Sequence, residues 1–281
     1  MTKHLSTRNH DRDVMGMTYV YPVVSRRAGG VSVGINLNTN NACNWHCAYC
    51  QVPNLVRGVA PEVDLDVLQA ELIAMLDDIV HGSFMTQCVP ESCRSLCDIA
   101  ISGNGEPTSS SAFDQVVAVI VDIMRQFGLS IPLRLITNGS YVHKPHVQAG
   151  LAEMAKHHGE VWIKVDSVTD AGIQRINGIK LDADRLAGQI RAVAEICPTW
   201  IQTCMMAWDG QLPTESDLGA YIRFLKTLKQ EDVPIFGILL YGLARPSLQQ
   251  EAVHLSALDE VWMQITAEHI RQSGFRVKLS L

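Results

Sequence analysis

The sequence has no long apolar run, and this absence disfavours a membrane-spanning helix. Its longest apolar stretches, at 116–123 and 235–240, are far shorter than the roughly 20 residues that a helix needs to cross a bilayer. The opening MTKHLSTRNHDRDVMGM is polar and mixed in charge, so it does not resemble a secretory signal. We therefore expect a cytoplasmic, soluble protein that does not bind membranes.

The sequence also lacks an excess of positive charge. Lys and Arg number 23 against 29 Asp and Glu, which gives a formal net charge of −6 at pH 7. Proteins that bind nucleic acid usually present a basic face, so this balance disfavours a nucleic-acid substrate without excluding one. Repeats and low-complexity segments are absent as well, and the 47% of hydrophobic residues suffices for a large core.

Strand-like and helix-like segments alternate along the chain. Six short apolar runs predict strands at 31–38, 98–102, 133–137, 161–165, 200–206 and 234–241. Amphipathic runs predict helices at 64–80, 112–128, 145–158, 181–196, 215–230 and 258–273. Such alternation is typical of parallel strands joined by crossover helices, and no dinucleotide-binding fingerprint follows the first strand.

The predicted fold is therefore α/β, a partial (β/α)6 TIM-like barrel of parallel strands. We expect one barrel domain at 31–281, preceded by an N-terminal extension at 1–30, and 275–279 is a further candidate strand. Asp64 is expected to cap the first helix, and Ser110 or Ser111 to cap the second, which Gly128 ends. The segment 81–96 is expected to be a loop.

Three cysteines follow the first predicted strand in one tight loop. In NACNWHCAYCQVPN, Cys43, Cys47 and Cys50 are separated by three and then two residues. Three thiolates at this spacing can bind three irons of a cubane cluster and leave the fourth iron open to an organic ligand. A structural zinc site would need a fourth ligand, and His46 lies inside the loop, where its geometry is poor. Zinc binding, or a chance group of buried cysteines, is the alternative interpretation.

The motif resembles the signature of the radical S-adenosylmethionine (SAM) superfamily, Cys-x3-Cys-x2-Cys with an aromatic residue before the last cysteine, here Tyr49. The resemblance implies one [4Fe–4S] cluster on Cys43, Cys47 and Cys50, with its open iron bound to SAM. In that family the reduced cluster cleaves SAM to a 5′-deoxyadenosyl radical, which takes a hydrogen atom from the substrate. The resemblance also implies a separate reductant, such as a flavodoxin or ferredoxin.

Polar loops follow the next strands, where barrel enzymes place their chemistry. The motif SGNGEPT resembles the family's Gly-Gly-Glu-Pro element, which implies SAM contacts from Gly103, Asn104, Gly105, Glu106 and Pro107. Asn104 stands where the family has glycine. TNG at 137–139 resembles an element of related enzymes, so Asn138 is a candidate contact to SAM or substrate. A plain turn is the competing interpretation of both segments.

The fourth strand ends in KVDS at 164–167. By resemblance, Asp166 and Ser167 are candidate contacts to the SAM ribose or carboxylate. Lys164 and Asp166 share one face of the strand, so an internal ion pair between them is the alternative. Cys204 is expected to be a small core residue, and Arg245 is a candidate contact to an anionic group.

A further three cysteines, Cys88, Cys93 and Cys97, have spacings of four and three residues. These spacings match no cluster motif and a fourth ligand is missing, so we expect a single cluster in this chain.

Three functions stay open on the sequence. The first is an enzyme that abstracts hydrogen from a small molecule or a modified nucleoside. It would belong to a compact branch that loosely resembles wyosine-type tRNA-modifying enzymes and activase-like iron–sulfur oxidoreductases. The second is a glycyl-radical-type activase that acts on a partner protein. The third is a non-catalytic iron–sulfur or zinc-binding protein.

Overall fold

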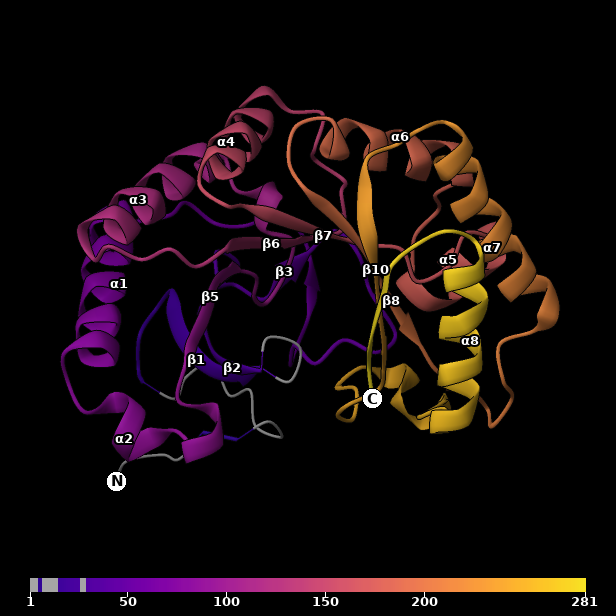
Figure 1. The fold of residues 1–281 in the computed structure, drawn as a ribbon, viewed down its shortest axis with the longest axis horizontal. Helices are drawn as coiled ribbons and strands as arrows, with labels where there is room; N and C mark the ends of the chain where they lie inside the picture. The colour runs from indigo at the N-terminus through magenta and orange to yellow at the C-terminus, as the bar shows by residue number, and fades with distance from the viewer. Residues whose placement is uncertain (1–4, 7–14, 26–28) are drawn as a thin grey trace.

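Eight strands form one continuous sheet in the computed structural model, which describes residues 5–6, 15–25 and 29–281. In order across the sheet they are β1 (Val20–Ser25), β2 (Gly30–Ile35), β5 (Leu96–Ile101), β6 (Leu133–Thr137), β7 (Glu160–Lys164), β8 (Thr199–Met205), β10 (Ile235–Gly242) and β12 (Val277–Ser280). β1 runs antiparallel to β2, and every other neighbouring pair is parallel. Within the described residues the two edge strands do not pair with each other, so the sheet curls into an open half-barrel (Figure 1).

The helices form an arch along the outer face of the sheet (Figure 1). They are α1 (Leu65–Val80), α2 (Phe84–Cys88), α3 (Phe113–Gln126), α4 (Pro145–Lys156), α5 (Asp170–Asn177), α6 (Ala183–Ala194), α7 (Glu215–Gln230) and α8 (Glu260–Gln272). Three single 3-10 turns are η1 (Glu91–Cys93), η2 (Pro107–Ser109) and η3 (Gln250–His254). Two short ribbons pair β3 (Ala42–Cys43) with β4 (Val56–Arg57), and β9 (Ala207–Trp208) with β11 (Leu255–Ser256). No helix among the described residues is long and apolar enough to span a bilayer.

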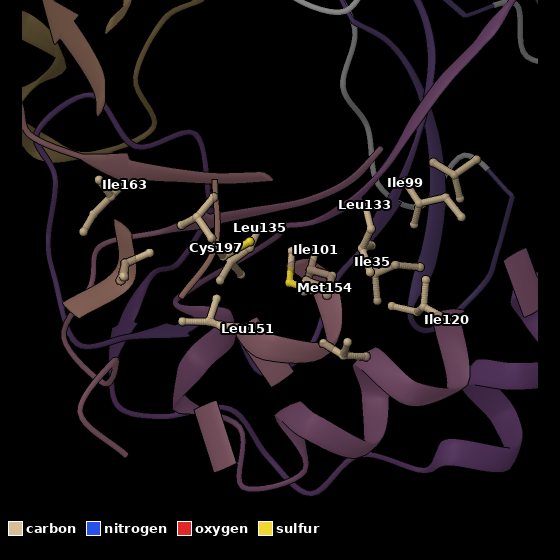
Figure 2. Close-up of a cluster of buried hydrophobic side chains, with 14 of the residues drawn as sticks. Ile35, Ile99, Ile101, Ile120, Leu133, Leu135, Leu151, Met154, Ile163 and Cys197 are labelled. Atoms are coloured by element: carbon tan, nitrogen blue, oxygen red, sulfur yellow. The ribbon is translucent and has the colours of Figure 1, made fainter. Parts of the chain in front are cut away.

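The main core lies between the sheet and the helices. Ile101 and Leu135 point outward from β5 and β6 into one cluster of buried side chains, which includes Ile120 of α3 and Met154 of α4 (Figure 2). Burying each such side chain contributes about 1.5–3 kcal/mol. Because side chains alternate along a strand, the residues that lie next to these in each strand face the lumen of the half-barrel instead. The outward face thus holds the fold together and leaves the inward face free to carry polar groups.

The six predicted strands are confirmed, and the candidate strand at 275–279 forms β12. Residues 20–25, which the sequence pattern assigned to the extension, form β1 and pair with β2 along six residues. Pro22 hides this strand from the pattern, because a proline donates no ladder hydrogen bond and is tolerated only at a sheet edge. β1 is such an edge.

Two local predictions are confirmed and two are corrected. Asp64 accepts hydrogen bonds from the Asp66 and Val67 amides and caps α1, and Gly128 ends α3 with a φ of 61°. The predicted serine cap of α3 is wrong, since Ala112 occupies the cap position and no side chain there bonds the helix. The loop expected at 81–96 contains α2 and η1 and enters β5 at its last residue.

Candidate functional site

The carboxyl ends of the parallel strands surround a cavity of about 280 Å³. Most of the residues that the sequence singled out line it: Cys43, Cys47, Tyr49, Cys50, Gly103, Asn104, Gly105, Glu106 and Asn138. Pro107 is buried in η2 instead, and Asp166 and Ser167 line a second cavity of about 320 Å³ beside α5 and α7. Arg245 and Cys204 also line the first cavity, and Cys204 is buried as expected.

The cysteine loop is fastened first to the end of β6. The Asn138 side-chain amide donates to the Asn44 side-chain oxygen at 2.9 Å. The Trp45 indole donates to the Ser140 hydroxyl at 3.0 Å. Asn138 thus supports the loop that carries the cysteines, in addition to lining the cavity.

A second attachment comes from α5, which the sequence pattern missed. The backbone amide of His46 donates to the Asn177 carbonyl at 3.0 Å, and that of Ala48 donates to the Ile176 carbonyl at 2.7 Å. Gly178 ends this helix in the left-handed region at a φ of 65°, and any Cβ there would lie 2.8 Å from the His46 carbonyl oxygen. The short helix therefore ends against the loop, and Asn-Gly at 177–178 was the helix-end signal that could have revealed it.

A third attachment comes from the segment that follows β10. The Ser247 hydroxyl donates to the Ala48 carbonyl at 2.7 Å, and the Leu248 amide donates to the Cys50 carbonyl at 2.9 Å. The Gln249 side-chain amide reaches the Val52 carbonyl at 2.8 Å. Burial removes these loop carbonyls from water, and the three donors replace water as their hydrogen-bond partners.

The glycines of the loop that follows β5 allow its backbone to lie close to neighbouring backbone. A Cβ on Gly105 would collide with the Ala42 carbonyl oxygen, and one on Gly103 with the Asn36 side chain. Asn104, which stands between them, donates from its backbone to Asn36 at 2.9 Å and from its side chain to Asn41 at 2.7 Å. The loop after β5 is therefore packed directly against the approach to the cysteines.

The Glu106 carboxylate joins the ends of β5 and β6. It accepts from the Thr108 amide at 3.1 Å, the Thr137 hydroxyl at 2.6 Å and the Asn138 amide at 2.7 Å. Burial raises the pKa of Glu106, although these hydrogen bonds oppose the rise. A buried carboxylate held this way fixes the two strand ends relative to each other.

Lys164, Tyr49 and Asp166 form a hydrogen-bonded chain behind the cysteines. The Lys164 ammonium donates to the Tyr49 hydroxyl at 3.0 Å, and that hydroxyl donates to Asp166 at 2.6 Å. The two charges therefore meet through Tyr49, and no direct ion pair joins them among the described residues. Burial alone would lower the pKa of Lys164, but Tyr241, Asp166 and nearby thiols outweigh it and raise that pKa. Lys164 therefore presents a cation on the cavity wall.

The thiols of Cys43 and Cys47 are held in their neutral form when nothing is bound. Burial is the largest cause and raises the pKa of each to about 12. Among the described residues, no three His, Cys, Asp or Glu side chains are arranged to share one metal ion. All eight cysteines are free thiols.

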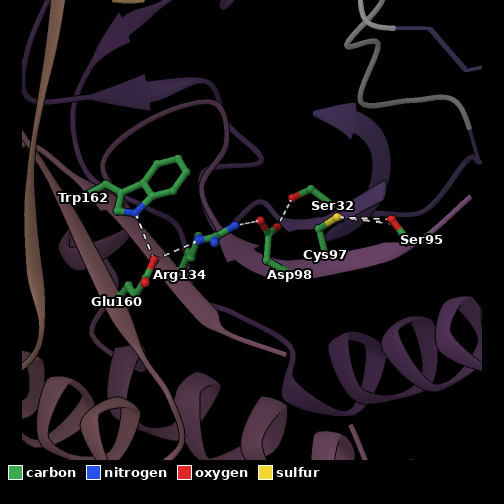
Figure 3. A network of polar contacts seen from close by, with 7 residues as sticks. All are labelled: Ser32, Ser95, Cys97, Asp98, Arg134, Glu160 and Trp162. Carbon is green, nitrogen blue, oxygen red and sulfur yellow. Dashed lines mark hydrogen bonds and ion pairs between the residues drawn. The ribbon is translucent and has the colours of Figure 1, made fainter. Parts of the chain in front are cut away.

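Toward the amino ends of the strands, the lumen contains a buried polar network (Figure 3). Arg134 pairs with Asp98 on one side and with Glu160 at 3.1 Å on the other, and Asp98 also accepts from Ser32. The Trp162 indole reaches Glu160 at 3.4 Å, and its ring lies 4.9 Å from the Arg134 guanidinium carbon. Sequence patterns missed this network because its members come from four strands.

Gln202 lies on β8 at the register of Lys164, and its side chain lines the same cavity. The residue is 1% exposed, and no donor in the described part of the chain reaches its side-chain oxygen. A buried amide oxygen without a donor costs about 1–3 kcal/mol. The arrangement therefore favours a ligand that brings a donor to this point.

No model of a protein family matches the chain. Several solved structures are similar in fold. TYW1 with a bound lysine–pyruvate adduct has a TM-score of 0.55 and 16% identity, covering 96% of this chain and 80% of that one. A radical SAM methyltransferase from Sphaerobacter thermophilus has a TM-score of 0.60 and 13% identity, covering 89% and 66%. Streptococcus suis SuiB bound to S-adenosylmethionine has a TM-score of 0.55 and 12% identity, covering 90% and 47%.

Among curated proteins, a GTPase Obg from Brachyspira hyodysenteriae is 28% identical over 133 residues. The match spans 46% of this chain and 17% of that protein, so the chain corresponds to less than a fifth of this relative's length. The identities to the solved structures lie well below a quarter, so what these structures share with the chain is the fold.

Proposed function

We propose that this chain, which has the fold of radical SAM enzymes, binds one [4Fe–4S] cluster on Cys43, Cys47 and Cys50 and uses it with SAM. One observation carries the proposal. Three free thiols of a single loop open into one cavity at the carboxyl ends of the parallel strands, where barrel enzymes place their reactive groups. When bound, the cluster and SAM supply a 5′-deoxyadenosyl radical that abstracts hydrogen from a substrate.

The thiols fit a cubane cluster better than a single metal ion. A mononuclear zinc site needs ligands that converge on one point, and the described residues offer no such group. A cubane needs no such convergence, because three thiolates bind three separate irons. The raised pKa of Cys43 and Cys47 does not prevent binding, since a thiol that coordinates iron releases its proton to solvent as the thiolate binds the metal.

SAM contacts are supported for the residues that line the cavity with the cysteines. The backbone at Gly103, Asn104 and Gly105 approaches the cavity closely, and one carboxylate oxygen of Glu106 accepts, within the described part of the chain, only from the Asn138 amide. This oxygen can accept a further bond from an ammonium group. Lys164 offers a matching cation for a carboxylate. We therefore place the amino-acid end of SAM between Glu106 and Lys164.

Pro107, Asp166 and Ser167 have less support as SAM contacts, because they lie outside that cavity. Both oxygens of Asp166 are already engaged, one by the Cys204 amide at 2.9 Å and the other by Tyr49 and Asn177. We propose that Asp166 orients Tyr49 and that Ser167, which faces the second cavity, is the freer of the two to meet a ribose.

The substrate is proposed to bind in the lumen below the cysteines. Gln202 supplies an acceptor that lacks a donor, and Trp162 supplies an aromatic surface on the same cavity. A small molecule or a nucleoside with an N–H or O–H group would satisfy Gln202. The reaction also requires a one-electron donor, and a flavodoxin or ferredoxin is the proposed class.

The test is SAM cleavage by anaerobically reconstituted protein. With dithionite and SAM, wild-type protein should release 5′-deoxyadenosine, and Cys47→Ala should not. Cys97→Ala is the matched control, because Cys97 is a partly exposed thiol outside the cavity and its loss should leave product formation intact. If wild-type protein produced no more 5′-deoxyadenosine than Cys47→Ala, the enzyme proposal would be wrong.

A further inference from the structure

The last residue of α5, Asn177, lies directly behind the cysteine loop and is 1% exposed. Its side-chain nitrogen lies 3.4 Å from the Cys47 sulfur and 2.8 Å from an Asp166 carboxylate oxygen. The two hydrogens of one amide nitrogen can therefore reach two acceptors at once. One of these acceptors is a sulfur that the proposed function assigns to the cluster.

Chemistry fixes the orientation of this amide. An asparagine side chain presents an oxygen on one side and a nitrogen on the other, and only the nitrogen can donate. A carboxylate and a thiolate are both acceptors, so the nitrogen must face them. Asp166 is itself held by the Tyr49 hydroxyl at 2.6 Å and the Cys204 amide at 2.9 Å, which keeps the acceptor that aligns Asn177 in place.

The backbone of Asn177 is fixed as firmly as its side chain. Its carbonyl accepts from the His46 amide at 3.0 Å, one residue before Cys47. Donor and sulfur are therefore tied together by two separate hydrogen bonds. The attachment of the loop to α5 thus holds the backbone of Asn177 beside that of Cys47.

We propose that Asn177 is a positioning residue that raises the reduction potential of the cluster through its hydrogen bond to Cys47. The inference rests on the proposed function. A donor beside a cysteine sulfur stabilises the negative charge that accumulates on reduction, so hydrogen bonds to the sulfurs are one of the factors that set cluster potentials. Removing the donor makes the cluster harder to reduce, and replacing it with a carboxylate does so more strongly.

The experiment is a redox titration of the reconstituted cluster without SAM, followed by electron paramagnetic resonance of the reduced form. Asn177→Leu removes the donor at similar volume, and Asn177→Asp keeps the shape but substitutes an acceptor. At the wild-type midpoint, Asn177→Leu should lower the ratio of reduced to oxidised cluster about tenfold, which equals a shift of about 59 mV for one electron. Asn177→Asp should lower it further.

Ser247→Ala is the matched control. Ser247 also fastens the cysteine loop, through the Ala48 and Cys50 carbonyls, and its hydroxyl is not bonded to a cysteine sulfur. Its loss should weaken the fold and leave the potential unchanged. If both Asn177 variants bind an intact cluster with the wild-type potential, this inference is overturned and the proposed function is not. The same holds if Ser247→Ala shifts the potential as much as the Asn177 variants do. Wild-type protein that binds no cluster would overturn the proposed function, and this inference with it.

Discussion

Two regions of this chain each hold three cysteines within ten residues or fewer. The first cysteine group is Cys43, Cys47 and Cys50, and the second cysteine group is Cys88, Cys93 and Cys97. The first follows the carboxyl end of β2 and opens into the cavity, where separate segments hold its loop. The second surrounds the amino end of β5, at the opposite end of the parallel strands.

The members of the second group do not share one environment. Cys88 is buried in the core at the end of α2, whereas Cys93 and Cys97 are partly exposed. The Cys97 sulfur lies 3.5 Å from the Ser95 hydroxyl. In the described part of the chain neither cysteine group converges on a single metal ion, and only the first group lines the cavity. The two groups are similarly rich in cysteine, and the comparison shows that they differ in the strand end beside which they lie and in access to the cavity.

The largest contrast should appear in iron binding. Replacing Cys43, Cys47 and Cys50 together with alanine should remove the cluster completely, because no other group of thiols faces the cavity. Cys93→Ala combined with Cys97→Ala should bind as much iron as wild-type protein. Iron content and the absorbance of the reconstituted proteins measure both. Iron loss from the second variant would mean that the two groups cooperate, and the comparison would fail.

Each group also lies against a glycine that cannot accept a side chain. A Cβ on Gly105 would collide with the Ala42 carbonyl beside the first group, and one on Gly30 would lie 2.7 Å from the Cys97 sulfur. Both alanine variants should lose about 1–3 kcal/mol of unfolding free energy through overpacking. Urea denaturation measures this loss. Only Gly105→Ala should also bind less iron than wild-type protein. Equal iron binding by the two variants would argue against the difference between the two cysteine groups.

A smaller effect is expected from Glu106→Gln. The substitution keeps the shape but turns an amide nitrogen toward groups that donate to Glu106, so about 2 kcal/mol of stability should be lost. Glu91→Gln, at an exposed position beside the second group, should change stability by less than about 0.5 kcal/mol. Thermal or urea unfolding of the cluster-free proteins compares the two. A stable Glu106→Gln would show that the carboxylate does not join the strand ends.

The smallest effect concerns a cysteine outside both groups. Burial, with a smaller contribution from Glu160, raises the pKa of the Cys197 thiol to about 12 from 9.0. The folded state thus keeps its proton where the unfolded state loses it. The stability that Cys197 contributes by keeping its proton is complete below pH 9 and is lost as the pH rises toward 12. By pH 10 the free energy of unfolding has fallen by about 1.4 kcal/mol for this reason.

Cys197→Ala removes that slope. The variant should be less stable than wild-type protein at pH 8, because it leaves a small cavity, and the difference should shrink by about 1 kcal/mol at pH 10. Urea titrations at the two pH values, under reducing conditions, measure the change. A difference that stays constant would show that Cys197 does not titrate in this window. The result would also sharpen the comparison, because a raised thiol pKa alone does not mark a cluster site.

The sequence predicted what depends on short-range patterns. The alternating strands and helices, the cap at Asp64 and the spacing of the first cysteine group each follow from neighbouring residues. β1 escaped because Pro22 interrupts its pattern, and α5 escaped because it is short and polar. The functions of these elements depend on tertiary contacts that no local pattern records.

The same limit explains what was missed around the cavity. An ion pair between Lys164 and Asp166 was the alternative to a SAM contact, yet Tyr49, more than a hundred residues earlier, lies between them. Asn177 contacts the Cys47 sulfur only because α5 ends against the cysteine loop. Gln202 and Arg134 reach the lumen through strand alternation, and the partners of Arg134, Asp98 and Glu160, come from the two neighbouring strands. Predicting them would require the register of the sheet.

The hydrogen bonds from residues 247–249 to the cysteine loop bear on the order in which the site forms. Gln249 donates to the carbonyl of Cys50 at 3.2 Å, across 199 residues of sequence. The loop that carries the cysteines is synthesised early, yet it acquires this support only after β10 has been made. The attachment of the cysteine loop to residues 247–249 is therefore among the last contacts of the half-barrel that the growing chain can form.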